Sequence, residues 1–282
     1  MGRAQVASGY GVSSISDNPA HVLTTGGTQL HVSQVAYIAG IEYGTLAYGW
    51  KSMNNFMALN LFYMDSGEME ETIPSFPDGT GEIFSVSMLS FKFTYGMKLM
   101  QNMNFGISGK YFSEGIASSE AASVSGLSVD LGATYILNSP KLVIGASLLN
   151  LGPDVQYHGD GLDINVPDTL ETGGVLARIT KEFPIPLTFK IGVSKEFNFD
   201  RHDIDVSIDL NKSMDYSTIF NIGGEYTFNK MISARLGSFI GHDTAFYALG
   251  LGCRVGGITV DYGLSNYGVF DYTHQFSLQL DL

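Results

Sequence analysis

The chain has 282 residues, a formal net charge of −13, 44% hydrophobic and only 15% charged residues. This balance is too apolar for a disordered chain. The negative charge argues against a nucleic-acid partner, because binding to phosphate backbones depends on Lys and Arg. No segment approaches the roughly 18 consecutive apolar residues of a membrane-spanning helix, so a membrane role would require strands. A lone cysteine, Cys253, excludes an internal disulfide.

Residues 1–27 are rich in Gly and Ser and show no sustained period of two. They contain the turn-forming triplet Asp17, Asn18 and Pro19, in which proline restricts the backbone and asparagine favours a turn. We expect these residues to form an N-terminal plug ahead of a single barrel domain, 28–282. The first residues contain no basic segment followed by an apolar core, so a secretory signal is not expected within them and Met1 is compatible with an internal methionine of a longer precursor.

From residue 28 onward the dominant pattern is a period of two, which places successive side chains on opposite faces of a strand. The segment 203–212 is the clearest example, with polar or acidic residues at odd positions and aliphatic residues at even positions up to 210. Fourteen segments of this kind are predicted as the strands of one wall: 28–34, 37–51, 56–65, 84–99, 103–112, 122–138, 141–151, 186–197, 203–212, 220–229, 231–240, 244–255, 257–266 and 272–282.

A fifteenth candidate strand, 168–181, raises the question of parity, because bacterial outer-membrane barrels use an even number of strands. We assign it to an excursion outside the wall. The long connections 66–82 and 152–184 then lie at one end of the strands, and the tight turns lie at the other. This asymmetry, short inside and long outside, is typical of outer-membrane barrels.

A soluble β-sandwich also shows alternation and is the competing fold. Three features favour the barrel: strands longer than the roughly 5 to 6 residues usual elsewhere, polar side chains on the inward-facing positions, and Tyr and Phe near strand ends. In lipid a sheet edge cannot be satisfied by water, so a spanning sheet must close. We therefore predict an all-β, antiparallel transmembrane β-barrel of about 14 strands in the bacterial outer membrane, surrounded by lipid. The last strand carries an alternating insertion pattern: Phe276, Leu278, Leu280 and Leu282.

No motif indicates catalysis, a cofactor or a metal, so the chain is not predicted to be an enzyme. The six histidines are scattered and are interpreted as surface or lumen residues. Gly-x-Gly repeats such as 250–257 lie within strands and are interpreted as strand glycines rather than a nucleotide site. One acidic group lacks the regular spacing of a calcium loop and is not predicted to bind a metal. That group comprises Asp154, His158, Asp160, Asp163 and Asp168.

Nine segments in a fixed order carry a resemblance to a known family: MGRAQVA (1–7), DNPA (17–20), 39–50, 59–72, 109–116, 129–135, 148–153, 186–194 and 208–226. Their order resembles the PorV/PorQ family, a branch of the FadL-like outer-membrane barrels. The resemblance implies a fourteen-stranded barrel with an N-terminal plug and a role in type IX protein secretion. The stretch 152–184 departs from the family's spacing.

Two functions follow from this resemblance. In the first, the barrel serves secretion or surface attachment of cargo by contacting a secretion-machinery or cargo protein through its outer loops. The residues expected to make those contacts are Glu68, Glu70, Glu71, Asp160 and Asp163. In the second, the barrel is a FadL-like channel for a hydrophobic small-molecule ligand, and residues 1–27 gate an apolar pocket.

Overall fold

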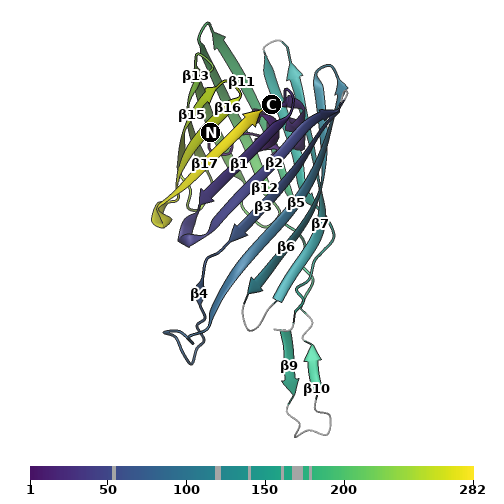
Figure 1. The fold of residues 1–282 in the computed structure, drawn as a ribbon, viewed down its shortest axis with the longest axis vertical. Helices are drawn as coiled ribbons and strands as arrows, with labels where there is room; N and C mark the ends of the chain where they lie inside the picture. Colours follow the sequence, from purple (N-terminus) through teal and green to yellow (C-terminus); the bar gives the residue numbers. More distant parts are fainter. Residues whose placement is uncertain (53–54, 118–121, 139–140, 160–161, 167–173, 178–179) are drawn as a thin grey trace.

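A computed structural model describes residues 1–52, 55–117, 122–138, 141–159, 162–166, 174–177 and 180–282. Fourteen antiparallel strands form one closed barrel (Figure 1). In chain order they are β1 (Gln29–Ala36), β2 (Glu42–Ser52), β3 (Asn55–Asp65), β5 (Ile83–Met100), β6 (Met103–Ala117), β7 (Ala122–Leu137), β8 (Leu142–Leu151), β11 (Thr188–Phe199), β12 (His202–Ser213), β13 (Ile219–Phe228), β14 (Ile232–Ile240), β15 (Tyr247–Val255), β16 (Ile258–Asn266) and β17 (Tyr272–Asp281).

Three neighbouring pairs of the ring are not consecutive in strand number. The first and last strands, β1 and β17, pair along the whole length of β1 and close the ring. β3 pairs with β5 across the connection that holds β4, and β8 pairs with β11 across the connection that holds β9 and β10. The prediction of fourteen wall strands is confirmed. Some strand bounds differ: β6 runs to Ala117 rather than 112, and β15 begins at Tyr247 rather than 244. The segment 37–51 was expected to be a single strand, but a short 3-10 turn, η3 (Ile38–Gly40), precedes β2. Ala39 and Gly40 both have left-handed backbone conformations, which end the extended run.

Three further short strands lie outside the ring. β4 (Met69–Glu70) extends the edge of β5 in the connection 66–82. β9 (Asp163–Val166) and β10 (Gly174–Ala177) form a separate two-stranded hairpin that projects beyond the barrel (Figure 1). Of the interval 168–181 the structure describes 174–177 and 180–181, and the strand in it, β10, lies outside the wall, as the parity of the strands predicted.

The two faces of the wall differ in polarity in the predicted direction. On β12 the even-numbered aliphatic residues are exposed on the outside, with Ile208 at 52%, whereas Ser207 and Asp209 on the inside are completely buried. On β17 the outward residues include Phe276 and Leu278, which are 59% and 40% exposed. An apolar exterior around a polar interior suits a surrounding of lipid, so the soluble β-sandwich alternative is wrong. The fold places the chain in the bacterial outer membrane.

The two ends of the barrel differ as expected. Tight turns join the strands at one end, including the turn of Asn229 and Lys230, both of which have left-handed backbone conformations. The connection 66–82 and the described parts of the connection 152–187, which include the β9–β10 hairpin, lie at the opposite end (Figure 1). We call these the periplasmic end and the outer end, following the asymmetry of outer-membrane barrels. Among the described residues, no helix is long and apolar enough to cross a membrane.

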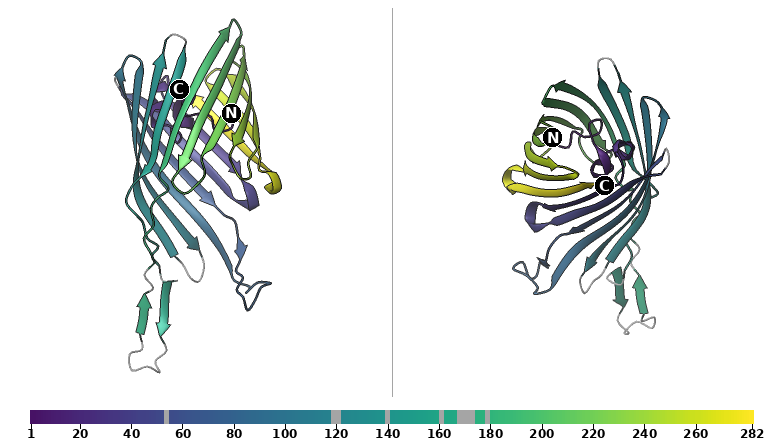
Figure 2. Two further views of the ribbon diagram at one scale, coloured as in Figure 1. Left: turned by 180° about the vertical axis from the view of Figure 1, so that it is seen from behind. Right: turned by 45° about the horizontal axis from the view of Figure 1, so that its top comes forward.

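Residues 1–27, which we call the N-terminal segment, lie inside the ring of strands (Figure 2). The segment contains two 3-10 turns, η1 (Gly11–Ser14) and η2 (Pro19–Thr24). Its apolar side chains pack on small and aromatic residues of β2 and β3 and form the largest buried cluster of the described residues. That cluster comprises Val12, Ile15, Val22, Leu23, Ala47, Phe56 and Ala58.

Candidate functional site

The triplet predicted to shape the plug lies deep in the lumen. Asn18 caps η2, because its side-chain oxygen accepts a hydrogen bond from the Ala20 amide at 3.0 Å and Pro19 occupies the first position of the turn. The Asn18 amide nitrogen donates to the Val6 carbonyl at 2.9 Å and to the Ala133 carbonyl of β7 at 3.1 Å. The buried Asn18 side chain thus links the start of the segment, at Val6, and its second turn to strand β7 of the wall.

Asp17 provides an ionic link on the neighbouring side. Its carboxylate lies 2.6 Å from the Lys190 ammonium of β11, and its carbonyl accepts a hydrogen bond from the Ser147 hydroxyl at 2.7 Å. Burial alone would raise the pKa of Asp17, but the adjacent Lys190 charge outweighs it and holds that pKa below its ordinary value. Asp17 is therefore ionised at neutral pH and ties the segment to β11.

His21 secures the first residues of the segment from within. Its Nε2 lies 2.9 Å from the Gln5 carbonyl and 3.1 Å from the Val6 carbonyl, so Nε2 carries a proton and donates to these acceptors. Burial lowers the pKa of His21 to about 4. The imidazole is therefore neutral at neutral pH. The Val6 amide in turn donates to the Asp209 carboxylate of β12 at 2.8 Å.

A ring of inward-facing glycines makes room for the segment. At seven positions on seven different strands, a Cβ atom would come closer than 3 Å to an atom of residues 1–27. At Gly106, the obstructing atoms are the backbone of Pro19 and Ala20, which cannot rotate away. The seven positions are Gly49, Gly96, Gly106, Gly132, Gly145, Gly223 and Gly237.

Sequence reasoning missed this ring. Glycines within strands were interpreted as ordinary strand residues. A usable signal was present, because on several strands glycine recurs at the same alternate positions as the polar residues, which face inward. The alternation could not show that these glycines pack against residues 1–27, because Gly106 and Pro19, for example, are far apart in the chain.

The lumen wall around the segment is polar and internally paired. The Lys92 ammonium on β5 lies 2.8 Å from the Asp130 carboxylate on β7, and Lys110 on β6 lies 3.8 Å from it. On the other side of the barrel, Arg235 of β14 bridges Glu225 at 2.6 Å and Asp261 at 2.5 Å. Paired charges of this kind are suited to a hydrated interior, and a neutral hydrocarbon would gain little binding free energy from contact with them.

Toward the outer end the inward-facing side chains become aromatic. Neighbouring rings are 5.3 to 6.1 Å apart between centroids and follow one another from β14 to β3 along the loops at the outer end. Most are tilted or edge-to-face, which are favourable arrangements for aromatic pairs. We call this set the aromatic row; its members are Phe239, His242, Tyr267, Tyr37, Tyr43 and Phe62.

The base of the excursion that departs from the expected family spacing packs on the opposite wall of the outer lumen. Val155 and Ile185 are buried against Val124 of β7 and the partly buried Phe112 of β6. The Tyr157 hydroxyl donates to the Glu114 carboxylate at 2.7 Å, a bond that raises the pKa of Tyr157 to about 12. The outer lumen is thus bordered by apolar side chains on both sides.

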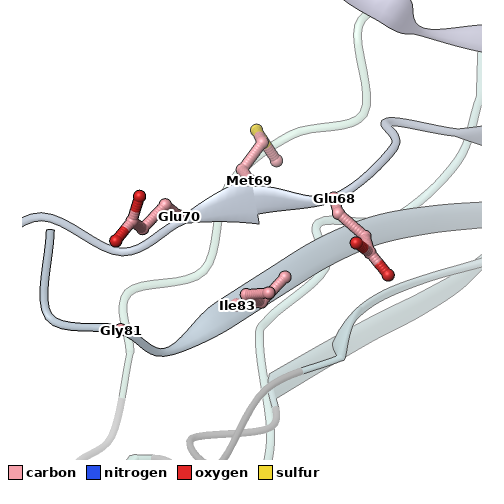
Figure 3. Close-up of a pocket in the computed structure, with 5 residues that line it drawn as sticks. All are labelled: Glu68, Met69, Glu70, Gly81 and Ile83. Carbon is pink, nitrogen blue, oxygen red and sulfur yellow. The ribbon is translucent and has the colours of Figure 1, made fainter.

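The acidic residues predicted for the outer loops do not form one site. Glu68 and Glu70 border an open pocket of about 360 Å³ between β4 and β5, together with Met69, Gly81 and Ile83 (Figure 3). Glu71 accepts a hydrogen bond from the Thr80 hydroxyl at 2.9 Å. Asp163 begins β9, and Asp160 lies outside the described residues. Contact of these residues with another protein stays a prediction. No group of three or more potential metal ligands occurs in the described part of the chain.

No protein-family model matches the sequence, and a search of curated proteins gives no match. Solved structures do match. The toluene transporter TodX of Pseudomonas putida aligns with 98% of this chain and 93% of its own at 15% identity, with a TM-score of 0.62. The toluene transporter TbuX of Ralstonia pickettii aligns with 100% of this chain and 98% of its own at 13% identity, with a TM-score of 0.62. A FadL homologue of Pseudomonas aeruginosa aligns with 99% of this chain and 97% of its own at 12% identity, with a TM-score of 0.58.

These likenesses show that the chain has the fold of FadL-type barrels. They also correct the first functional hypothesis. The predicted PorV/PorQ role in type IX secretion is wrong, because three structures that share this fold over nearly its whole length are two toluene transporters and a FadL homologue. A secretion-machinery or cargo protein as partner finds no support in these likenesses. These neighbours are transport proteins rather than enzymes, in keeping with the prediction that the chain is not an enzyme.

Proposed function

We propose that this chain admits hydrophobic small molecules, compact aromatic ones among them, through the bacterial outer membrane. The observation that carries the proposal is the aromatic row at the outer end of an otherwise polar lumen. Aromatic faces offer a hydrophobic ligand both apolar contact and favourable ring geometry. A barrel that carried only polar solutes would have no use for such a surface inside its wall.

The ligands of similar structures agree with this proposal. Two of the barrels with this fold are described as toluene transporters. Toluene is a single apolar ring, and the half-buried members of the row, Tyr37, Tyr43 and Phe62, could offer it aromatic contact. We expect the outer lumen of this chain to accept molecules of the same kind.

In this proposal the N-terminal segment is the plug that separates the outer lumen from the periplasm. Its contacts with β7, β11 and β12 and the glycine ring support that role, with Asp17, Asn18 and Pro19 as its central anchor. The remaining residues, 28–282, form the barrel domain. Beneath the segment, a polar pocket of about 450 Å³ includes Gly9, His21, Asn104 and Asp205 in its lining and leads to the periplasmic end.

Uptake of toluene by Gram-negative cells that express the barrel tests the proposal. Phe62 faces the lumen and its neighbour Leu61 faces the lipid, so Phe62→Ala and Leu61→Ala are matched changes on one strand. An aromatic contact contributes about 0.5 to 1.5 kcal/mol beyond its buried area. We therefore expect Phe62→Ala to lower the uptake rate roughly threefold to tenfold, and Leu61→Ala to leave it unchanged at equal surface levels.

Two results would refute the proposal. One is wild-type uptake no faster than that of cells with an empty vector. The other is an equal effect of the inward and the outward substitution, since the lumen would then have no part in the uptake.

A further inference from the structure

The N-terminal segment packs closely on only part of the inner wall. Its two turns, η1 and η2, pack against β1, β2, β3, β5, β6 and β7, and its first residues lie against β13 and β14 at Gly223 and Gly237. None of the seven glycines of the ring lies on β15, β16 or β17, which are neighbours in the wall (Figure 1). We call the inward face of β15–β17 the open wall.

At the open wall an inward-facing glycine has free space in front of it. A Cβ atom at Gly263 of β16 would have only atoms of Gln275 within 4 Å, the nearer of them at 3.6 Å. Gln275, which pairs with Gly263 and faces the same side of the wall, is exposed. By contrast, Thr94 of β5 and Ser108 of β6, on the wall that carries the segment, are completely buried. The segment therefore leaves space along β15–β17 that it fills along β5 and β6.

Partly exposed polar side chains follow one another along this space. Because inward positions alternate with lipid-facing ones, they form a continuous polar lining on the lumen side. Glu225 of β13 and Arg235 of β14, at the border of the open wall, have side chains that are 25% and 22% exposed. On the open wall itself the polar residues that are at least partly exposed include Ser265, Gln275, Ser277, Asp261 and Arg254.

Glycines on β15 hold the charged groups of this lining against the wall. The Arg235 guanidinium reaches from β14 across β15 to the Asp261 carboxylate of β16, at 2.5 Å, and also bridges Glu225. A Cβ atom at Gly252 would lie 3.0 Å from Arg235 Nη1, and one at Gly250 would lie 3.4 Å from Arg235 Cβ. Larger residues at these two positions would push the guanidinium into the lumen. The paired charges therefore line the space and do not cross it.

We infer that water and small hydrophilic solutes, inorganic ions among them, pass the docked N-terminal segment along the open wall. Polar and paired charged groups on a pore lining replace part of the hydration of such solutes. The same lining offers a hydrophobic molecule little binding free energy. This path is a second activity of the barrel, which does not rest on the proposed uptake of hydrophobic molecules and needs no departure of the segment from the lumen.

Single-channel conductance of the full chain in planar bilayers, measured in potassium chloride, tests this path. Gly263→Ser, Gly263→Leu and Gly263→Trp place side chains of increasing volume in the space in front of β16, and the 3.6 Å contact with Gln275 tolerates a Cβ there. Conductance should fall in that order. In Gly263→Trp it should fall at least about threefold, because conduction depends on the free width of the pore.

Gly109→Trp is the matched control. It adds the same bulk on the lipid-facing side of β6, where nothing lies within 4 Å of a Cβ atom, and should keep the wild-type conductance. An unchanged shift in gel mobility on heating would show that each variant is folded. Should Gly263→Trp fail to fold, the smaller Gly263→Leu still tests the expected decrease.

Three outcomes overturn the inference. The first is a wild-type conductance no greater than that of a protein-free bilayer. The second is equal conductance along the Gly263 series, as expected if ions passed only when the segment had left the lumen. The third is an equal loss in Gly109→Trp. None of these outcomes bears on toluene uptake at the aromatic row, which Phe62→Ala tests separately.

Discussion

The two halves of the lumen are built from the same alternating strands but present opposite surfaces. In the inner half, buried polar side chains and glycines hold the N-terminal segment by hydrogen bonds, an ion pair and close backbone packing. In the outer half, inward positions carry aromatic rings. Inward-facing strand positions are therefore not always polar. They carry glycine or polar residues where the N-terminal segment packs on them, and aromatic residues at the outer end.

The largest effect should come from filling the space that the inward-facing glycines of the inner half leave for the N-terminal segment. In Gly106→Val the new side chain would meet the backbone of Pro19 and Ala20. Overpacking typically costs about 1 to 3 kcal/mol and occasionally more. Here the obstructing atoms are backbone atoms and β-branching leaves few rotamers to avoid them, so we expect a cost above the upper end of that range. We expect the N-terminal segment to leave its site and the single-channel conductance in planar bilayers to rise several-fold.

Gly109→Val is the matched control on the same strand, because no atom lies within 4 Å of a Cβ at that outward position. It should keep the wild-type conductance. Equal conductance of the two variants would mean that the glycine ring does not hold the segment.

The next effect concerns pH and acts only on the inner half. His21 is neutral when the segment is docked, because burial lowers its pKa from 6.5 to about 4. Below pH 6.5 the undocked segment binds a proton that the docked one excludes, so docking is at full strength above pH 6.5 and weakens as the pH falls toward 4. The shift corresponds to roughly 3 kcal/mol.

Hydrogen exchange of residues 1–27, followed by mass spectrometry between pH 7.5 and 4.5 and corrected for intrinsic rates, measures this effect. In the wild type, protection of the amides of residues 1–27 should decrease as the pH is lowered. In His21→Asn, whose side chain does not titrate, protection should change much less with pH. A pH profile that is identical in both chains would exclude His21 as its origin.

The smallest of the three effects comes from the ion pair between Asp17 and Lys190. Asp17→Asn removes the carboxylate charge from a pair whose side chains are 24% and 14% exposed, so water screens part of the loss. We expect docking of the segment to weaken by about 1 to 2 kcal/mol. Raising the salt concentration should weaken the wild type and leave Asp17→Asn nearly unaffected.

The same exchange measurement, made at low and at high salt, checks this result. Asp215→Asn, at an exposed residue in the connection between β12 and β13, is a suitable control for general salt effects. Should both variants show the wild-type dependence on salt, the ion pair would have no measurable role in docking.

Much of the barrel could be predicted from the order of residues, because strand periodicity is local. The odd and even positions of 203–212 alone indicate which side faces lipid, and the structure confirms it on β12. The parity argument also correctly placed β10, the described strand within 168–181, outside the wall. The start of β2 was missed, because Tyr37 to Ile41 continues into the apolar run of β2 without a break in composition, although left-handed backbone at Ala39 and Gly40 makes it a turn.

Most of the candidate site could not be predicted in this way, because it joins residues distant in the chain. The triplet Asp17, Asn18 and Pro19 was selected for its turn chemistry, yet its partners Lys190 and Ala133 have no local pattern that marks them. The aromatic row was likewise hidden. Tyr and Phe near strand ends were interpreted as a general sign of a membrane barrel, whereas closure of the barrel brings the rings from Phe239 to Phe62 next to one another.

The sequence by itself determined an all-β chain whose alternating strands, even count and unequal connections require a closed wall in a membrane, since each of these properties belongs to a strand and its neighbours. Only the tertiary structure decided what that wall encloses. Packing of the N-terminal segment against the glycine ring, and the succession of rings from Phe239 to Phe62, depend on closure of the barrel, which pairs the first wall strand with the last. Contacts of that range have no periodicity along the chain.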